Sequence, residues 1–414
     1  MEKLRKDRAI LHCDLNNFFA SVEVKLNPAL AGRSVAVCGN PEERKGIVLA
    51  KCEIAKKFGV KTGDTVWMAK QKCPGIEIVI PKHHEYSKFA KMVQQIYYQY
   101  TDMVEPFGID ECWLDVTGSE RLFGDGPQIA RTIRDRVAAE LGLTISVGVS
   151  WNKTYAKIAS DLKKPNAITV VTRENYQSVI LSLPVESMLF IGRKTKKLFE
   201  KLNIMTIGDL AAFDIDVLRG YLGITAEKLV TAARGDDVSP VSAFTDVREV
   251  KSVGNGTTVP KDLKTVKEVT QVIYILSEEV ATRLRRKGFK GFTVNLGIRD
   301  TDLSWCGAQE SIRVATNSVR TIQNVAMNIF AKLWVIRGDK VAPIHSMRVS
   351  VSNLTRERMA QLDLFSDGAQ EDTNDKLSSV FDKIRRKHGT EKLAFGTALA
   401  GTLGLEFEVL DEVF

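Results

Sequence analysis

The sequence predicts an α+β protein with several domains, and three observations point to this fold class. The chain has 414 residues, which is about three times the length of an ordinary domain. Residues 1–171 mix short β-branched strand patterns with amphipathic helical patterns, so that strands distant in the chain are available to pair. Residues 172–236 are almost all helical in pattern, and residues 251–350 again combine helix with strands.

Strand and helix patterns follow one another through the first half of the chain. Residues 8–15 alternate as a strand and lead into a helical segment at 16–26. Two further strands, 34–39 and 46–51, are joined by the turn NPEERK and precede an amphipathic helix at 53–59. The remaining elements of this half are a helix at 84–103, a strand at 104–117, a helix at 127–141, a strand at 144–150, a helix at 152–162 and a strand at 167–171.

The second half predicts a helical unit, a linker, a mixed unit and a tail. Residues 172–236 form helices with short glycine-bearing turns, and residues 237–250 have few periodic signals, as expected of a linker. A helix at 263–286 precedes three strand patterns, GFTVNLGIR, SIRVAT and IHSMRVSVSNL. The tail after residue 353 is polar and acidic, with one apolar island, QLDLF.

The charge of the chain is unevenly distributed. The net charge is +8, and residues 241–350 alone carry 17 basic and 10 acidic side chains, whereas residues 351–414 carry 8 and 12. A basic middle favours a polyanionic partner such as nucleic acid, because Lys and Arg release counterions when they cover phosphates. Many proteins of this charge bind no polyanion, so charge alone leaves both interpretations open.

The composition excludes several other classes of protein. No run approaches the roughly 18 apolar residues of a membrane helix, and the N-terminal segment has no cleavage site, so we expect neither a membrane partner nor a signal peptide. The six cysteines form no CxxC pair, which excludes a zinc ribbon or a disulfide framework and fits a reducing cytosol. We therefore expect a cytoplasmic location.

Three acidic residues form the strongest chemical pattern. Asp14 ends the first strand, and Asp110 and Glu111 lie inside a predicted strand, GIDECWLDV. Carboxylates gathered where strands meet suit Mg²⁺, which prefers oxygen ligands and substrate phosphates. Two such ions about 4 Å apart can drive an in-line phosphoryl displacement. The residues alone also allow a structural role, in which Asp110 or Glu111 caps a loop or pairs with an arginine.

Five motifs in one order resemble the Y-family of translesion DNA polymerases, and the closest group is the bacterial DNA polymerase IV type. They are DLNNFFASVE, LNPALAG, AKKFGVKTG, GIDECWLD and VGVSWNKTYAKIASDLKKPNAITVV. The resemblance implies a right-hand polymerase with a ferredoxin-like palm, small fingers, a helical thumb with a helix-hairpin-helix, and an α+β little finger. The implied boundaries are palm 1–20 and 79–171, fingers 21–78, thumb 172–236, linker 237–250, little finger 251–352, and a tail at 353–414.

The resemblance also implies an activity. It is template-directed, Mg²⁺-dependent addition of dNTPs to a primer 3′ end, with low fidelity and no proofreading, which continues across damaged template. Asp14, Asp110 and Glu111 match the family's catalytic, metal-binding acids, and the backbone carbonyl of Leu15 is a further expected ligand of the two Mg²⁺ ions. The expected partners are primer–template DNA and dNTPs, and the protein is expected to act as a monomer.

Four side chains match the family's nucleotide-binding positions. Phe19 falls at the family's aromatic steric gate, where a ring excludes a ribose 2′-hydroxyl by steric overlap. Phe18 beside it is also expected to contact the substrate, although its position suits a core residue better. Lys164, in DLKKPNA, matches a lysine that reaches the triphosphate. Lys56 stands where the family usually has an arginine, and Glu53 where it has a tyrosine, so the usual finger contacts are altered. From the pattern alone, Lys153, Lys157 and Lys163 are expected to be surface charges.

Two segments match DNA-binding regions of the family. The turn before 193–201 resembles a helix-hairpin-helix, in which backbone amides at a helix start hold a phosphate without reading bases. The cluster of positive charges in 283–290 precedes a strand and suggests contacts with duplex phosphates. The alternative is a helix end whose cations complement the helix dipole. The expected DNA-binding residues are Ile191, Gly192, Arg193, Lys194, Arg285, Arg286 and Lys287.

The apolar island in the tail resembles the short peptide with which bacterial polymerases bind the sliding clamp. Leu362, Leu364 and Phe365 would fill a pocket, and Gln361 would orient the peptide. Such tethering raises the local concentration of a weakly binding enzyme. The alternative is a last turn of structure that packs on the little finger.

Two other functional classes remain to be weighed against a polymerase. A catalytically weak, clamp-linked DNA-binding accessory protein would keep the fold and lose the acids, yet Asp14, Asp110 and Glu111 are present. A two-metal nuclease or phosphatase would use water as the nucleophile. The expected steric gate and thumb hairpin favour nucleotide addition.

Overall fold

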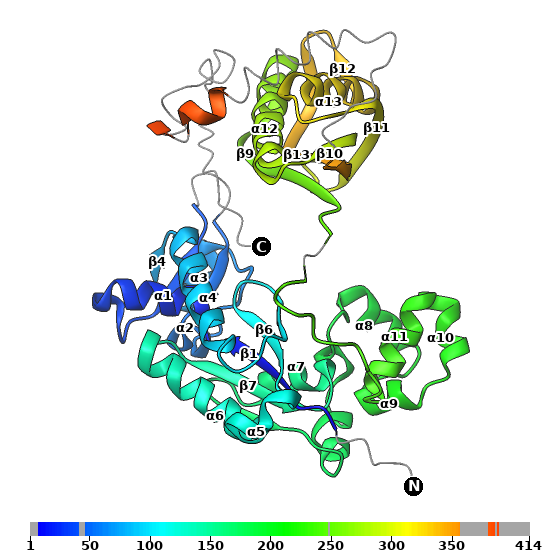
Figure 1. Cartoon of the computed structure of the whole chain (residues 1–414). Helices are drawn as coiled ribbons and strands as arrows, with labels where there is room; N and C mark the ends of the chain where they lie inside the picture. The colour runs from blue at the N-terminus through cyan, green and yellow to red at the C-terminus, as the bar shows by residue number, and fades with distance from the viewer. Residues whose placement is uncertain (1–6, 41–45, 247–248, 357–379, 386, 389–414) are drawn as a thin grey trace. The chain divides into compact units, whose positions relative to one another are not determined.

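The computed structural model of the chain describes residues 7–40, 46–246, 249–356, 380–385 and 387–388 (Figure 1). These residues divide into two compact units, the first with residues 7–39 and 47–246 and the second with residues 40, 46, 249–356, 380–385 and 387–388. Both units combine helices with sheets, which confirms the predicted α+β multidomain class. No helix in the described ranges is long and apolar enough to cross a membrane.

A five-stranded sheet forms the centre of the first unit. Its strand order is β5-β6-β1-β7-β8, antiparallel except for the last pair. Side chains alternate along β1, so Leu11 and Cys13 join the core with the helices on one face, while His12 and Asp14 lie on the face that α7 covers. The strands are β5 (Val104–Pro106), β6 (Glu111–Asp115), β1 (Ile10–Leu15), β7 (Ile145–Ser150) and β8 (Ile168–Val170), and the helices are α4 (His83–Tyr97), α5 (Glu120–Phe123), α6 (Gly126–Arg136) and α7 (Lys153–Leu162).

The segment predicted as one strand at 104–117 is instead two strands joined by a turn. β5 ends at Pro106 and β6 begins at Glu111. Proline cannot donate to the ladder, and Gly108 adopts φ +83°, a conformation that other residues rarely adopt. Asp110 therefore lies in the turn at the start of β6 and not inside a strand, which corrects the prediction.

A smaller sheet and short helices make up the segment predicted as fingers. β2 pairs with β3 on one side and with β4 on the other, and their core includes Ala36, Val48 and Ala69. The elements are α1 (Phe18–Leu26), β2 (Val35–Cys38), β3 (Val48–Lys51), α2 (Glu53–Lys57), α3 (Val66–Lys72) and β4 (Glu77–Val79).

The helical segment predicted as the thumb packs against the end of the main sheet. Phe199, Leu210 and Leu229 share a core with Trp151 and Tyr155 from the sheet region. The helices are α8 (Arg193–Lys201), α9 (Ile207–Ala212), α10 (Ile215–Leu222) and α11 (Ile224–Ala233).

Residues 237–246 of the predicted linker are bound to the first unit. Ser242 donates its backbone N–H to Glu105 Oε2 at 2.9 Å, and Phe244 donates its backbone N–H to the carbonyl of Asp102 at 3.0 Å. Val241 is buried in a cluster with Ile10. Residues 237–246 thus lie fixed along the sheet.

The second unit packs two helices on one face of a sheet. The sheet has the order β11-β10-β13-β12, and β9 pairs with β13. β9 was not predicted, because its sequence SVGNGTTVPKDLKT is rich in Gly, Asn, Pro and Lys, which are poor strand formers. The elements are β9 (Ser252–Thr265), α12 (Val266–Lys287), β10 (Lys290–Asp300), β11 (Trp305–Thr316), α13 (Val319–Leu333), β12 (Ile336–Arg337) and β13 (Lys340–Thr355).

A short helical segment at residues 380–388 docks on α12. The guanidinium of Arg285 donates two hydrogen bonds to the carboxylate of Asp382, Nε to Oδ2 at 2.6 Å and an Nη atom to Oδ1 at 2.9 Å. Two turns earlier on α12, Glu278 pairs with Arg385 at 2.7 Å. All four side chains are less than one fifth exposed, so these two pairs join the segment to the second unit.

Candidate active site

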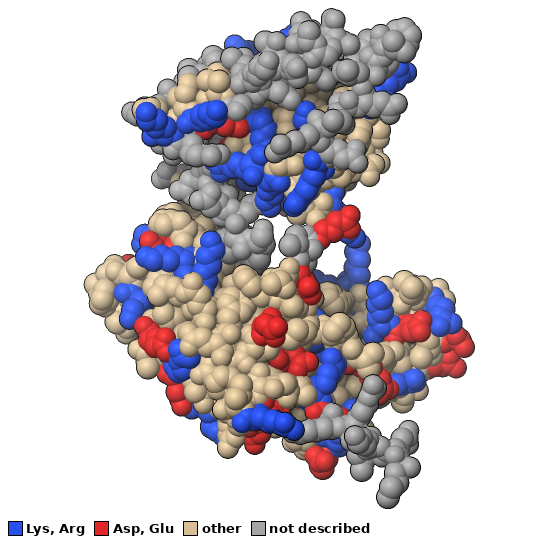
Figure 2. All heavy atoms as spheres, viewed as in Figure 1, with Lys and Arg blue, Asp and Glu red and all other residues tan. Residues whose placement is uncertain are grey.

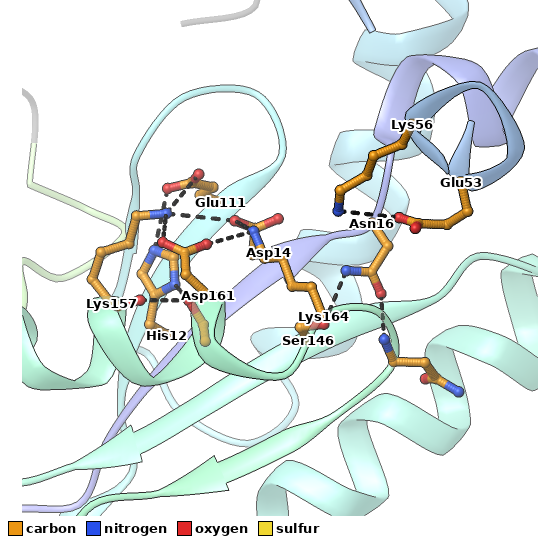
Figure 3. Close-up of polar contacts among 12 residues, drawn as sticks. His12, Asp14, Asn16, Glu53, Lys56, Glu111, Ser146, Lys157, Asp161 and Lys164 are labelled. Atoms are coloured by element: carbon orange, nitrogen blue, oxygen red, sulfur yellow. Dashed lines mark hydrogen bonds and ion pairs between the residues drawn. The ribbon is translucent and has the colours of Figure 1, made fainter. Parts of the chain in front are cut away.

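A polar cavity opens at the end of β1, between the main sheet and the small sheet. Its volume is about 330 Å³. It brings together side chains from four distant parts of the sequence, and Figure 3 shows several of them. The predicted site residues that line it are Asp14, Leu15, Phe18, Lys56, Asp110, Glu111 and Lys164.

The register of the sheet places the acids together. Asp14 pairs with Glu111 across β1 and β6, and with Ser146 across β1 and β7. The backbone N–H of Leu15 donates to the carbonyl of Asp110 at 3.0 Å, which holds the turn before β6 against the end of β1. The three acids therefore line one cavity at the end of β1 and the start of β6.

Two lysines lie among these acids. Lys157 Nζ is 2.9 Å from Glu111 Oε1 and 3.5 Å from Asp14 Oδ2, and Lys164 Nζ is 2.6 Å from Asp14 Oδ2 (Figure 3). Both ammonium groups also reach Asp161, at 3.4 Å and 2.7 Å. The expectation that Lys157 and Lys153 are surface charges was wrong, because their side chains are only 13% and 14% exposed. α7 carries both lysines toward partners on the sheet.

The local environment shifts the pKa values of the three acids in different directions. Burial raises the pKa of Asp14 to about 7, against the opposing charge of Lys164. Burial and the neighbouring Glu111 also raise the pKa of Asp110. Burial alone would raise the pKa of Glu111, but the hydrogen bond with His12 and the charge of Lys157 outweigh it and lower the pKa to about 2. Such divergent shifts in one cavity are typical of functional sites.

His12 and Asn16 belong to the site although sequence reasoning missed them. His12 is fully buried, with Nδ1 2.8 Å from Ser160 Oγ and Nε2 3.3 Å from Glu111 Oε2. Asn16 donates to Ser146 Oγ at 2.9 Å and accepts from the backbone N–H of Asn166 at 2.8 Å, next to the loop that carries Lys164. Both are polar residues in or beside the apolar strand before the helix, which was the available signal.

The oxygen atoms that line the cavity are chemically suited to bind a hard divalent cation. Asp14, Asp110, Glu111 and the carbonyl of Leu15 all offer oxygen, the ligand that Mg²⁺ prefers. Glu111 Oε2 is a buried oxygen whose polar neighbour is His12 Nε2, at 3.3 Å. Within the described residues, however, no three His, Cys, Asp or Glu side chains are close enough to hold a metal ion. The carboxylates of Asp14 and Glu111 are instead engaged by lysine ammonium groups.

The two neighbouring phenylalanines have different surroundings. Phe18 is buried in the core of the first unit and also lines the cavity. Phe19, the expected gate, is half-buried and stacks on Tyr86 with ring centroids 4.2 Å apart and planes 14° apart. Tyr86 in turn donates its hydroxyl to the buried carboxylate of Glu23 at 2.7 Å. The ring of Phe19 is therefore held by a stack whose position is fixed by a hydrogen bond.

Glu53 has partners that reduce its repulsion of an anion. Its Oε1 accepts from Asn17 Nδ2 at 3.0 Å. The same oxygen lies 3.6 Å from Lys56 Nζ (Figure 3). Both Glu53 and Lys56 line the cavity. Glu53 and Lys56, the two residues that differ from the usual family pattern, thus form an ion pair on the side of the site that belongs to the predicted fingers.

The predicted DNA-binding residues lie in both units. Gly192 precedes α8, Arg193 and Lys194 in its first turn are exposed, and Ile191 is buried in the core of that segment. In the second unit Arg286 is exposed and Lys287 half-buried, whereas Arg285 is engaged by Asp382. Figure 2 shows more Lys and Arg than Asp and Glu on the visible face of this unit. Gln361, Leu362, Leu364 and Phe365 lie outside the described residues.

Comparisons with known proteins identify the family. The model of the impB/mucB/samB family matches residues 13–161, and that of its C-terminal domain matches residues 250–364. The chain is 44% identical to the DNA polymerase IV of Acetivibrio thermocellus, over 95% of this chain and 98% of the relative. It is 36% identical to DNA polymerase IV 2 of Bacillus subtilis, over 98% of each chain.

A solved structure shares the fold. A Y-family DNA polymerase chimera of Dbh and Dpo4 superposes with a TM-score of 0.73 at 23% identity, covering 84% of this chain and 100% of the chimera. The family models and the relatives that match nearly the whole chain show the family, and this structure shows the fold. The chain belongs to the impB/mucB/samB family, in the DNA polymerase IV group of the Y-family DNA polymerases.

Proposed function

We propose that this chain is a low-fidelity, template-directed DNA polymerase that extends a primer 3′ end with dNTPs and continues across damaged template. The observation that carries the proposal is the cavity in which Asp14, Asp110 and Glu111 face Lys164 and Lys56. Carboxylates there can hold cations, and the lysines can neutralise a triphosphate. An accessory protein without catalysis is not favoured, because the acids are retained and relatives over the whole chain are named DNA polymerase IV.

We further propose that two Mg²⁺ ions bind Asp14, Asp110, Glu111 and the carbonyl of Leu15. When bound, such ions activate the attacking oxygen and stabilise the leaving one. The protein's own residues hold these oxygens in place through the pairing of β1 with β6. Lys164, on the loop after α7, contacts Asp14 at 2.6 Å and would exchange this partner for a phosphate of the bound nucleotide.

Primer extension tests this function. The full chain is incubated with Mg²⁺, four dNTPs and a labelled primer on an undamaged template, and then on a template with one abasic site. Primers that lengthen in a distributive ladder support the proposal. Primers that shorten would indicate a nuclease, and unchanged primers with intact DNA binding would indicate the accessory protein.

Replacing Phe19 with alanine is expected to lower discrimination against ribonucleotides by at least about tenfold, because an aromatic ring rejects the 2′-hydroxyl by overlap. The measurement is the ratio of kcat/KM for a dNTP to that for the matching rNTP. Phe123→Ala is the matched control, since Phe123 is a 41% exposed phenylalanine on α5 that packs on Tyr100, whereas Phe19 lies on α1 directly after the cavity-lining Phe18. An unchanged ratio in the Phe19 variant would remove the gate assignment.

We propose that the protein contacts the phosphate backbone of DNA at two places. These are the turn before α8, with Ile191, Gly192, Arg193 and Lys194, and the end of α12, with Arg285, Arg286 and Lys287. Exposed cations at a helix start and on a basic unit support contacts with phosphates. Arg285 joins them only when Asp382 releases it.

We also propose that the protein acts as a monomer tethered to a sliding clamp through QLDLF. Deleting residues 361–365 should leave extension of a short primer within about twofold and remove most of the stimulation by the clamp, since tethering acts through local concentration. The measurement compares synthesis on a long primed template with and without clamp. Equal stimulation of both proteins would contradict the assignment, and a deletion of equal length at 366–370 is the control.

A further inference from the structure

Lys157 lies where two of the metal-binding acids face each other. Its ammonium group contacts Glu111 Oε1 at 2.9 Å and Asp14 Oδ2 at 3.5 Å, and it does so from α7, on the opposite side of the site from the fingers. The side chains of Lys157, Asp14 and Glu111 are 13%, 7% and 20% exposed. Two carboxylates buried this closely repel each other unless a positive charge lies between them.

The same oxygens are the ones that a divalent cation would use. An ammonium group and a metal ion compete for carboxylate lone pairs, and both cannot occupy the space between Asp14 and Glu111. Binding of a metal ion there therefore requires that the ammonium group of Lys157 have another partner.

Asp161 supplies that alternative partner. It lies one turn after Lys157 on α7 and is 48% exposed, at the outer side of the cluster. Its carboxylate is 3.4 Å from Lys157 Nζ and 2.7 Å from Lys164 Nζ, so each lysine already touches both an inner acid and Asp161 (Figure 3). A flexible lysine stem can change between such partners with little rearrangement, which a planar arginine fork cannot.

We propose that Lys157 is a positioning residue that takes the place of a cation between Asp14 and Glu111 in the metal-free protein. Asp161 receives Lys157 and Lys164 when a divalent ion binds. The device holds the two buried carboxylates in place before substrate arrives. It rests on the proposed function in one respect, the assignment of Asp14 and Glu111 as metal ligands.

The test is metal binding without catalysis. Mn²⁺ is titrated into the full chain without DNA or nucleotide, and the free ion is measured by electron paramagnetic resonance. Lys157→Met removes the charge and retains much of the length, so we expect Mn²⁺ to bind about fivefold more tightly than to the parent, as expected from losing one screened charge at short range. Lys163→Met, at an exposed lysine six residues along the chain, should leave Mn²⁺ affinity unchanged.

A second pair of variants tests the role of Asp161. Asp161→Asn should weaken Mn²⁺ binding in the parent background, because the displaced lysines lose their partner. In the Lys157→Met background the same change should have a smaller effect, since residues that act together are not additive. Equal effects in both backgrounds would show that Asp161 acts only through its own charge and would overturn its assigned role.

The outcomes separate this inference from the function itself. If Lys157→Met, or Lys157→Gln should the first variant fail to fold, gains no Mn²⁺ affinity, the inference is overturned. If the parent extends primers in that case, the polymerase assignment stands alone. If the parent does not extend primers but the variant gains affinity, the lysine device holds and the proposed reaction fails.

Discussion

Asp110→Ala is expected to reduce the rate of primer extension by about a thousandfold or more, because an enzyme that loses a preorganised electrostatic contact at the reacting atoms slows on this scale. Asp110 lines the cavity at the turn before β6, next to Glu111. Its removal leaves the carbonyl that fixes Leu15 in place, because that contact is made by backbone atoms. The fold and the DNA-binding surfaces should therefore survive.

The measurement pairs single-turnover extension with DNA affinity from fluorescence anisotropy. Affinity in the absence of nucleotide should stay within about twofold, since phosphate contacts elsewhere supply most of it. Asp135→Ala is the matched control, because Asp135 is a 65%-exposed acid on α6. Extension by Asp110→Ala at the rate of this control would exclude a catalytic role for Asp110.

Gly148→Ala is expected to destabilise the first unit by about 3 kcal/mol, at the upper end of ordinary overpacking. A methyl group on Gly148, in β7, would lie 1.9 Å from the carbonyl oxygen of Ala156 and 2.5 Å from the backbone nitrogen of Ser160. Both atoms belong to the backbone of α7, which cannot yield as the end of a side chain can. The helix must move away from the sheet.

Thermal and urea unfolding of the full chain measure this effect. Gly118→Ala is the control, because nothing lies within 4 Å of its added methyl group. Since α7 carries Lys157 and Asp161, the displaced helix should also weaken extension in the fraction that remains folded. An unchanged midpoint would mean that α7 and β7 are packed less closely than described.

The sequence predicts the strands and the acids of this site because both depend on short-range patterns. β1 is a largely apolar run with Asp14 next to its last residue, and the motifs around Asp110 and Lys164 are specific in order and spacing. Their convergence on one cavity depends on the antiparallel pairing of β1 with β6 and β7. The resemblance to a known family implied that pairing, and composition or periodicity alone did not.

The parts that were missed depend on register or on context. Lys157 has an ordinary amphipathic setting, and only the close packing of α7 on β7 directs its ammonium group to Glu111. β9 has weak strand propensity and exists because β13 offers it a partner edge. The described part of the linker has no periodicity, yet its backbone binds Glu105 and Asp102 in the sheet region.

The docking of the segment at 380–388 restricts how a partner could bind the chain between β13 and this segment. Since β13 ends at Thr355 and Asp382 is bound to Arg285, the stretch between them is attached to the second unit at both of its ends. A peptide within it has no free end to thread into a closed pocket. Any receptor for QLDLF must therefore have a groove open at both ends, and closing a loop of this length adds an entropic cost that grows only slowly with its length.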